Sequence, residues 1–94
     1  MNSVISESSK IHRQLRDQGR LTQLAVSDSG FLFDANSGQS YALNSSASWL
    51  LRELIREDDT DEIVQHLAQY FGLDASRASL TVDHFLEQLA RYLL

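Results

Sequence analysis

The residues that most often carry chemistry are few in this chain and lie far apart. Its three histidines, His12, His66 and His84, stand alone in the sequence, which has no H-E-x-x-H pattern and no cysteine. A zinc site needs His or Cys ligands at short, regular spacing. We therefore predict no metal site, and we expect His66 and His84 to lie on the exposed flanks of helices.

The acidic run E-D-D-T-D-E at residues 57–62 is a second chemical candidate. A calcium loop needs oxygen ligands that alternate over about twelve residues around a central glycine, and this spacing is missing. The run is better explained as a helix start, with Asp59 or Thr60 as the N-cap and the other carboxylates near the positive end of the helix.

Three closely spaced serines, Ser45, Ser46 and Ser48, do not indicate a nucleophilic site, because no base can be placed beside them. The sequence also has no glycine-rich phosphate loop and no G-x-S-x-G motif. We therefore assign no catalytic residue, expect no cofactor, and predict a binding module in place of an enzyme.

Length and composition favour one small cytoplasmic domain. A chain of 94 residues buries only roughly 60% of the surface of its unfolded form, which leaves little room for an enclosed active site. No apolar run approaches the roughly 20 residues of a membrane span. The N-terminal residues lack the basic start and apolar core of a signal peptide, so we expect no membrane partner.

The charge distribution argues against nucleic acid as a partner. The net charge is −5, and the whole excess of acidic residues lies in residues 44–94, because residues 1–43 carry four basic and four acidic side chains. A DNA-binding helix needs Lys and Arg to neutralise phosphates. The last helical region offers only Arg77 and Arg91, against Asp74, Asp83 and Glu87.

Residues 39–51 join a strand directly to a helix, and the rest of the fold is organised around them. Tyr41 and Leu43 lie two apart and share one face of a strand. Asn44 or Ser45 is then a natural N-cap. Apolar residues recur after it at helical spacing, namely at Ala47, Leu50, Leu51, Leu54 and Ile55.

The segments on either side complete an α+β fold, a three-stranded antiparallel sheet followed by three helices. We predict strands at 21–26, 31–33 and 40–43, because turn-forming residues that end in glycine separate them. The helices are predicted from Ser45 to Arg56, from Asp59 or Thr60 to a C-terminal Gly72, and from Asp74 or Ser76 onward.

Residues 1–20 are expected to form a separate N-terminal arm, solvated and partly disordered or weakly helical, before a domain at 21–94. Val4, Ile11 and Leu15 could line a weak helical stripe that Gly19 ends. A modest basic cluster lies in this arm, consisting of Lys10, Arg13, Arg16 and Arg20. An arm that becomes ordered against a partner is the alternative.

The third predicted strand, Ser40 to Leu43, contains neither proline nor charge. Edge strands without such residues readily accept another strand. An extended peptide could therefore add to this edge and place alternate side chains in a groove beside a helix. Alternatively, the N-terminal arm or a second copy of the chain covers the edge.

Three sequence pieces stand out when they are taken in order, namely Y-A-L-N-S-S-A at residues 41–47, Q-Y-F-G-L at 69–73 and V-D-H-F-L-E-Q-L-A-R-Y-L-L at 82–94. Together they resemble the PqqD-like proteins, the peptide chaperones of pyrroloquinoline quinone biosynthesis and related precursor-recognition elements of ribosomally made, modified peptides. The resemblance covers residues 21–94 and implies a winged-helix-like fold. It also implies a non-catalytic role, in which the protein holds the leader segment of a precursor peptide and presents it to a radical-SAM enzyme, cyclase or leader peptidase.

The same resemblance implies that the leader lies along the third strand, in a groove shared with the third helix. Carried onto this sequence, the strand residues are Ser40, Tyr41, Ala42 and Leu43, and the helix residues are Val82, Asp83, Phe85, Leu86 and Leu89. We expect Leu86, with Asp83 and Ala90, to be the better groove candidate, and we leave open whether Phe85 and Leu89 belong to the core. The acidic helical half favours a leader with Lys or Arg.

Two other functions share this fold class. One is a winged-helix DNA-binding regulator, against which the charge distribution argues. The other is a PqqD-like protein–protein adaptor that serves an enzyme without any modified peptide. A monomer and a strand-exchanged dimer are both compatible with an open edge beside a loose arm.

Overall fold

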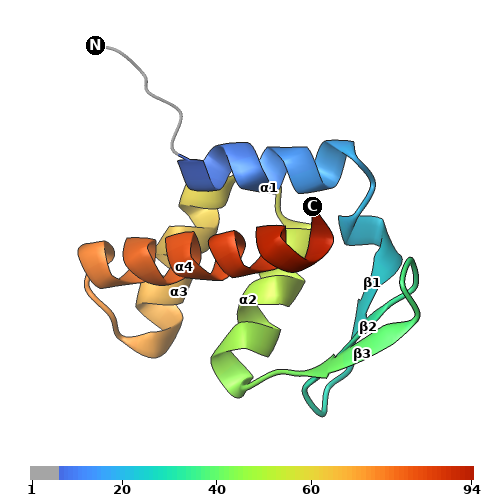
Figure 1. Cartoon of the computed structure of the whole chain (residues 1–94). Coiled ribbons are helices and arrows are strands. Elements are labelled where there is room, and N and C mark those ends of the chain that lie inside the picture. Colours follow the sequence, from blue (N-terminus) through green and yellow to red (C-terminus); the bar gives the residue numbers. More distant parts are fainter. Residues whose placement is uncertain (1–6) are drawn as a thin grey trace.

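The computed structural model describes residues 7–94, which form four helices and a three-stranded sheet (Figure 1). The elements in chain order are α1 (Glu7–Asp17), a 3-10 turn (Leu21–Gln23), β1 (Leu24–Val26), β2 (Phe31–Asp34), β3 (Gln39–Ala42), α2 (Ser45–Arg56), α3 (Thr60–Phe71) and α4 (Ala75–Leu93). The predicted α+β class is confirmed, and α1 is an additional helix in front of the sheet.

The sheet is an antiparallel meander in the order β1-β2-β3, so β3 lies at one of its edges. In the register, Leu32 of β2 lies opposite Tyr41 of β3, and Phe33 lies opposite Ser40. Side chains alternate along β2, where Leu32 is buried and Phe33 is exposed. The buried face packs toward the helices, and the other face of the sheet is open.

Local capping sets the helix boundaries that the sequence predicts. Asn44 accepts a bond from the Ala47 N–H at 2.8 Å, and Asp59 accepts one from the Asp61 N–H at 3.0 Å. Gly72 ends α3 in the left-handed conformation, with φ of 67°. Because each cap contributes about 1 kcal/mol to helix stability, these short helices begin and end where their sequences specify.

The hydrophobic core lies between α2, α3, α4 and the inner face of the sheet. Leu51 and Leu54 of α2, Ile63 of α3 and Val82 of α4 have no exposed surface. Within residues 7–94, no helix is long and apolar enough to cross a membrane.

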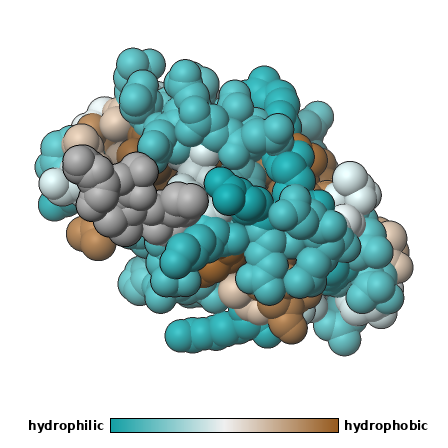
Figure 2. Space-filling model, turned by 90° about the horizontal axis from the view of Figure 1, so that it is seen from above, coloured by the Kyte–Doolittle hydropathy of each residue, from teal (hydrophilic) through white to brown (hydrophobic). Residues whose placement is uncertain are grey.

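Helix α1 belongs to this core, so the expectation of a solvated arm is wrong for residues 7–20. Leu15 is fully buried and His12 is 1% exposed, because α1 packs on α4 and α3 (Figure 1). Its outward face is mainly hydrophilic (Figure 2). The weak stripe therefore forms a packed helix at Ile11 and Leu15, whereas Val4 lies outside the described residues; the division of the chain at residue 20 stays a prediction.

Two predicted strand boundaries also differ from the structure. Residues 21–23 were expected to be extended, but they form a 3-10 turn in which the Gln23 N–H bonds the Arg20 carbonyl at 3.1 Å. The turn directs the Arg20 side chain inward, where it is buried. At β3 the strand spans Gln39–Ala42, one residue earlier than predicted.

Candidate functional site

An apolar groove runs between β3 and the C-terminal half of α4. Its volume is about 200 Å³. The sheet contributes one wall, formed by Leu32, Tyr41, Ala42 and Leu43, and α4 contributes the other, formed by Phe85, Gln88, Leu89, Tyr92 and Leu93. Tyr41 and Tyr92 meet across it with ring centroids 5.7 Å apart. The groove is thus an open channel along the edge strand, with aromatic rings from both walls at one position.

The backbone of β3 offers hydrogen-bonding groups along this channel. The Leu43 N–H bonds the Gly30 carbonyl at 2.6 Å, which fixes the alternation of bonded and non-bonded pairs between β2 and β3. Tyr41 therefore bonds toward β2, whereas the N–H and carbonyl groups of Ser40 and Ala42 point toward the open edge. Within residues 7–94, β3 pairs with no strand other than β2.

Helix α1 does not cover this edge, because it packs against α3 and α4. Figure 1 shows α1 and the sheet at different sides of the molecule. For residues 7–20, the alternative in which the arm covers β3 is therefore wrong.

The structure brings together six of the nine site residues predicted from the sequence, although Ser40 differs from the others. Tyr41, Ala42, Leu43, Phe85 and Leu89 line the groove. Ser40 lies on the same strand, with its side chain on the outer face of the sheet beside Phe33.

The other three residues lie on a different flank of α4. Val82 and Leu86 have no exposed surface, and the Ser8 hydroxyl of α1 donates a hydrogen bond to the Asp83 carboxylate. The prediction that Leu86 and Asp83 face the groove is wrong, because α1 covers the flank of α4 on which they lie. Phe85 and Leu89, left open between groove and core, both line the groove; Leu89 is buried and also belongs to the core, whereas Phe85 is only partly buried.

Sequence reasoning missed Gln88, Tyr92 and Leu93, which complete the wall on α4. The signal was present in the spacing, since residues 85, 88, 89 and 92 follow the i, i+3, i+4, i+7 pattern of one helix face. A glutamine in that pattern does not suggest an apolar surface, and Tyr92 is 70% exposed.

Comparison with known protein families shows to which family the chain belongs. A family model described as Coenzyme PQQ synthesis protein D (PqqD) matches residues 30–94. The chain belongs to the PqqD family. The match includes β2, β3 and all three following helices, and therefore both walls of the groove, whereas α1 and β1 precede it. No curated protein and no solved structure shows significant similarity to the chain.

The groove of this PqqD-family domain is uncharged: its lining within residues 7–94 includes no Asp, Glu, Lys or Arg. The expected preference for a basic leader therefore has no carboxylate to act through inside the channel. Apolar side chains are the natural occupants of such a surface, since its favourable interaction comes from removing apolar area from water.

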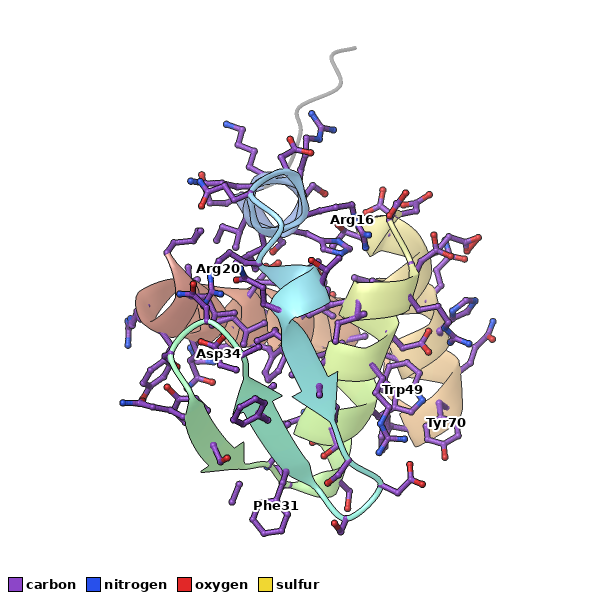
Figure 3. All side chains as sticks on the ribbon, turned by 90° about the vertical axis from the view of Figure 1, so that its right-hand side faces the viewer. Arg16, Arg20, Phe31, Asp34, Trp49 and Tyr70 are labelled. Carbon is purple, nitrogen blue, oxygen red and sulfur yellow. The ribbon has the colours of Figure 1, made fainter. Side chains whose placement is uncertain are left out.

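A buried ion pair connects the two walls of the groove. The Arg20 guanidinium donates to both Asp34 carboxylate oxygens, at 3.0 and 3.3 Å, and its Nε donates to the Leu93 carbonyl at 3.0 Å. Asp34 ends β2 at the turn into β3, and Leu93 ends α4. The bond from Arg20 is the main reason that the pKa of Asp34 lies below its usual value. Figure 3 shows Arg20 and Asp34 side by side at this junction.

His12 connects α1 to α2 and α3 through buried hydrogen bonds. Its Nε2 lies 2.8 Å from the Leu54 carbonyl, and its Nδ1 lies 2.8 Å from the Thr60 hydroxyl. The carbonyl only accepts, so Nε2 carries the hydrogen and Nδ1 accepts from Thr60. Burial lowers the pKa of His12 despite the bond to the Leu54 carbonyl. This histidine is a structural group far from the groove.

A second apolar surface lies on α2 and α3. Trp49 stacks on Tyr70 with centroids 5.4 Å apart, and Phe71 meets the Trp49 ring edge-on. Trp49 of α2 thus packs against aromatic side chains of α3 (Figure 3). Within residues 7–94, no group of three His, Cys, Asp or Glu side chains is arranged to hold a metal ion.

Proposed function

We propose that this protein binds the leader segment of a ribosomally made precursor peptide as a fourth strand along β3. It presents the bound peptide to a modifying enzyme, such as a radical-SAM enzyme, a cyclase or a leader peptidase, and does not catalyse the modification itself. The observation that carries the proposal is the apolar groove beside the open edge of β3.

Two features of the edge support strand addition. The outward N–H and carbonyl groups of Ser40 and Ala42 can supply backbone hydrogen bonds, which give affinity without regard to sequence. The channel beside them receives every second side chain of an added strand, which gives selectivity. Membership of the PqqD family supports a peptide-binding role in general.

The test is a fluorescence-polarisation titration. Labelled leader peptides, one from each small open reading frame beside the gene, are titrated with the purified protein, with duplex DNA as a control. We expect saturable binding to one leader that changes little with salt. Binding to DNA alone, weakened by salt, would favour the winged-helix regulator. Binding to neither would favour the adaptor without a modified peptide.

Ala42→Pro tests the strand-addition mechanism itself. Proline removes an N–H that points away from β2, so the ladder within the sheet stays intact while the edge loses a donor. We expect leader affinity to fall at least tenfold, with little change in the melting temperature. The matched control is Ala42→Ser, which keeps the N–H and should bind normally. Equal affinities for the two variants would contradict strand addition.

The proposal also includes a modifying enzyme as partner, a cytoplasmic location, and either a monomer or a strand-exchanged dimer as the oligomeric state. Sedimentation of the free protein distinguishes a monomer from a strand-exchanged dimer. If β3 edges pair in a dimer, the leader should compete with dimerisation, because both need the same backbone groups.

A further inference from the structure

Two phenylalanine rings lie exposed on the outer face of the sheet, next to the edge strand. Phe31 and Phe33 are 55% and 45% exposed, and both point away from the helices. Figure 3 shows Phe31 projecting from β2 away from the core. Exposed aromatic rings at successive outward positions of one strand form an apolar patch, which in a small protein commonly marks a contact surface.

The residues between these rings and the open edge are small. In the register of the sheet, Ala42 lies opposite Phe31, and Ser40 lies opposite Phe33. Their side chains point to the same outer face, so β3 places only a methyl and a hydroxymethyl group between the rings and the edge. The patch therefore extends sideways to the edge at which we place the leader.

The geometry of strand addition brings leader side chains to this patch. Strands lie about 4.8 Å apart, so a fourth strand would lie about 9.6 Å from β2, across Ser40 and Ala42. Leader residues opposite Ser40 and Ala42 would point to the outer face. Because Ser40 and Ala42 leave the space between largely unfilled, a Leu or Phe at such a position and a phenylalanine ring can lean toward each other and meet over the small residue.

We propose that Phe31 and Phe33 form a second subsite for the leader, on the face of the sheet opposite the groove. This inference rests on the proposed function. It names the class of peptide: the bound segment carries large apolar side chains at consecutive positions, alternately directed into the groove and onto the phenylalanine pair. A strand that is covered on both faces has a nearly continuous apolar sequence. A leader recognised by the groove alone would instead alternate apolar and polar residues.

The test combines a protein variant with a scan of the peptide. Each residue of the fluorescein-labelled leader that binds is replaced in turn by serine, and every peptide is titrated with the wild type and with Phe31→Ser/Phe33→Ser. We expect the double variant to bind the unmodified leader roughly tenfold more weakly. Serine at the outward leader positions should weaken binding to the wild type and have little further effect on the variant. Serine at the alternating inward positions should weaken binding to both proteins.

The matched control is Tyr70→Ser, which removes an aromatic ring that is 68% exposed on α3, away from the edge strand. It should bind the leader as the wild type does. Circular dichroism melts of the variants check the fold, which the removal of exposed rings should leave intact.

Two outcomes would overturn the inference while the proposed function stands. One is an unchanged Kd of the double variant for the leader. The other is a serine scan in which every substitution in the leader weakens binding equally to the wild type and to the double variant. A change in dimerisation at unchanged leader affinity would assign the patch to a second copy of the chain and overturn the inference as well. Failure of every leader to bind the wild type would overturn the proposed function and this inference together.

Discussion

Helix α4 has two apolar flanks, of which one is buried in the protein interior and the other lines the groove. On one flank Val82 and Leu86 are fully buried, and Asp83 bonds to α1. On the other flank Phe85 and Leu89 face β3 across an open groove. The difference does not lie in the hydrophobicity of α4 itself. It lies in the neighbour, because α1 packs along one flank, here called the closed flank, whereas the other, the open flank, borders the groove beside the short sheet.

The largest expected effect comes from placing a charge on the closed flank. Leu86→Asp leaves a buried carboxylate without a partner and removes a core side chain, so we expect unfolding or a loss of at least about 4 kcal/mol in the free energy of unfolding. Phe85→Asp, one residue away on the open flank, should lose leader binding and retain a cooperative urea transition. Similar stability losses for the two variants would show that the flanks are not distinct.

Breaking the ion pair that connects the groove walls should have the next largest effect. Asp34→Ala leaves the buried Arg20 charge without its carboxylate, and we expect a loss of about 3 kcal/mol in the free energy of unfolding, measured by urea denaturation. Leader affinity should fall as well, because Arg20, which still bonds the end of α4, would no longer connect it to the β2–β3 turn. Arg52→Ala, which removes a largely exposed ion pair with Asp28 at 3.8 Å, is the control and should change stability little. If Asp34→Ala binds the leader with full affinity under conditions in which the variant is folded, the Arg20–Asp34 ion pair does not shape the groove.

Acid should weaken the docking of α1 on α2 and α3 through His12. Its folded pKa lies below the ordinary value of 6.5 because burial disfavours the charged ring. The stability that neutral His12 contributes is therefore fully present above about pH 6.5 and is lost as the pH falls through the folded pKa. We expect the urea midpoint to decline between pH 7 and pH 5 more steeply in the wild type than in His12→Gln, which has no ring to protonate. Parallel declines in the two proteins would assign the acid sensitivity to other groups.

The smallest effect is expected for the hydrogen bond between α1 and α4. Asp83→Ala removes the acceptor of the Ser8 hydroxyl at the rim of the closed flank, so a loss of about 1 kcal/mol in unfolding free energy is expected. Leader affinity should not change, because Asp83 lies outside the groove. A large loss of leader affinity in Asp83→Ala would return this residue to the binding surface.

Local signals made much of the fold predictable. The three strands and the three following helices follow from turn residues, periodicity and capping chemistry within short windows. Of the two cap candidates that the sequence offers for each helix, the structure uses Asn44, Asp59 and Asp74. The sequence also showed that the third strand carries no proline and no charge, whereas its place at an edge of the sheet comes from the structure.

The sequence could not reveal which flank of α4 is closed. That depends on α1, whose apolar content is sparse and whose docking relies on polar bonds to distant carbonyl groups. Arg16, for example, donates to the Leu54 carbonyl at 2.9 Å. Side-chain bonds across 38 residues leave no periodic trace in the sequence, so the helix resembled a solvated arm and the wrong flank was assigned to the groove.

The position of Arg20 affects which residues a shortened chain must include to keep the groove intact. The family match begins at residue 30 and contains both groove walls, yet the guanidinium that spans those walls lies ten residues upstream of it. A chain trimmed to the matched region would retain every side chain that lines the channel and lose the arginine that bonds to both of its walls. In this protein, the smallest unit that keeps the groove and its bridging arginine is therefore larger than the region by which its family is recognised.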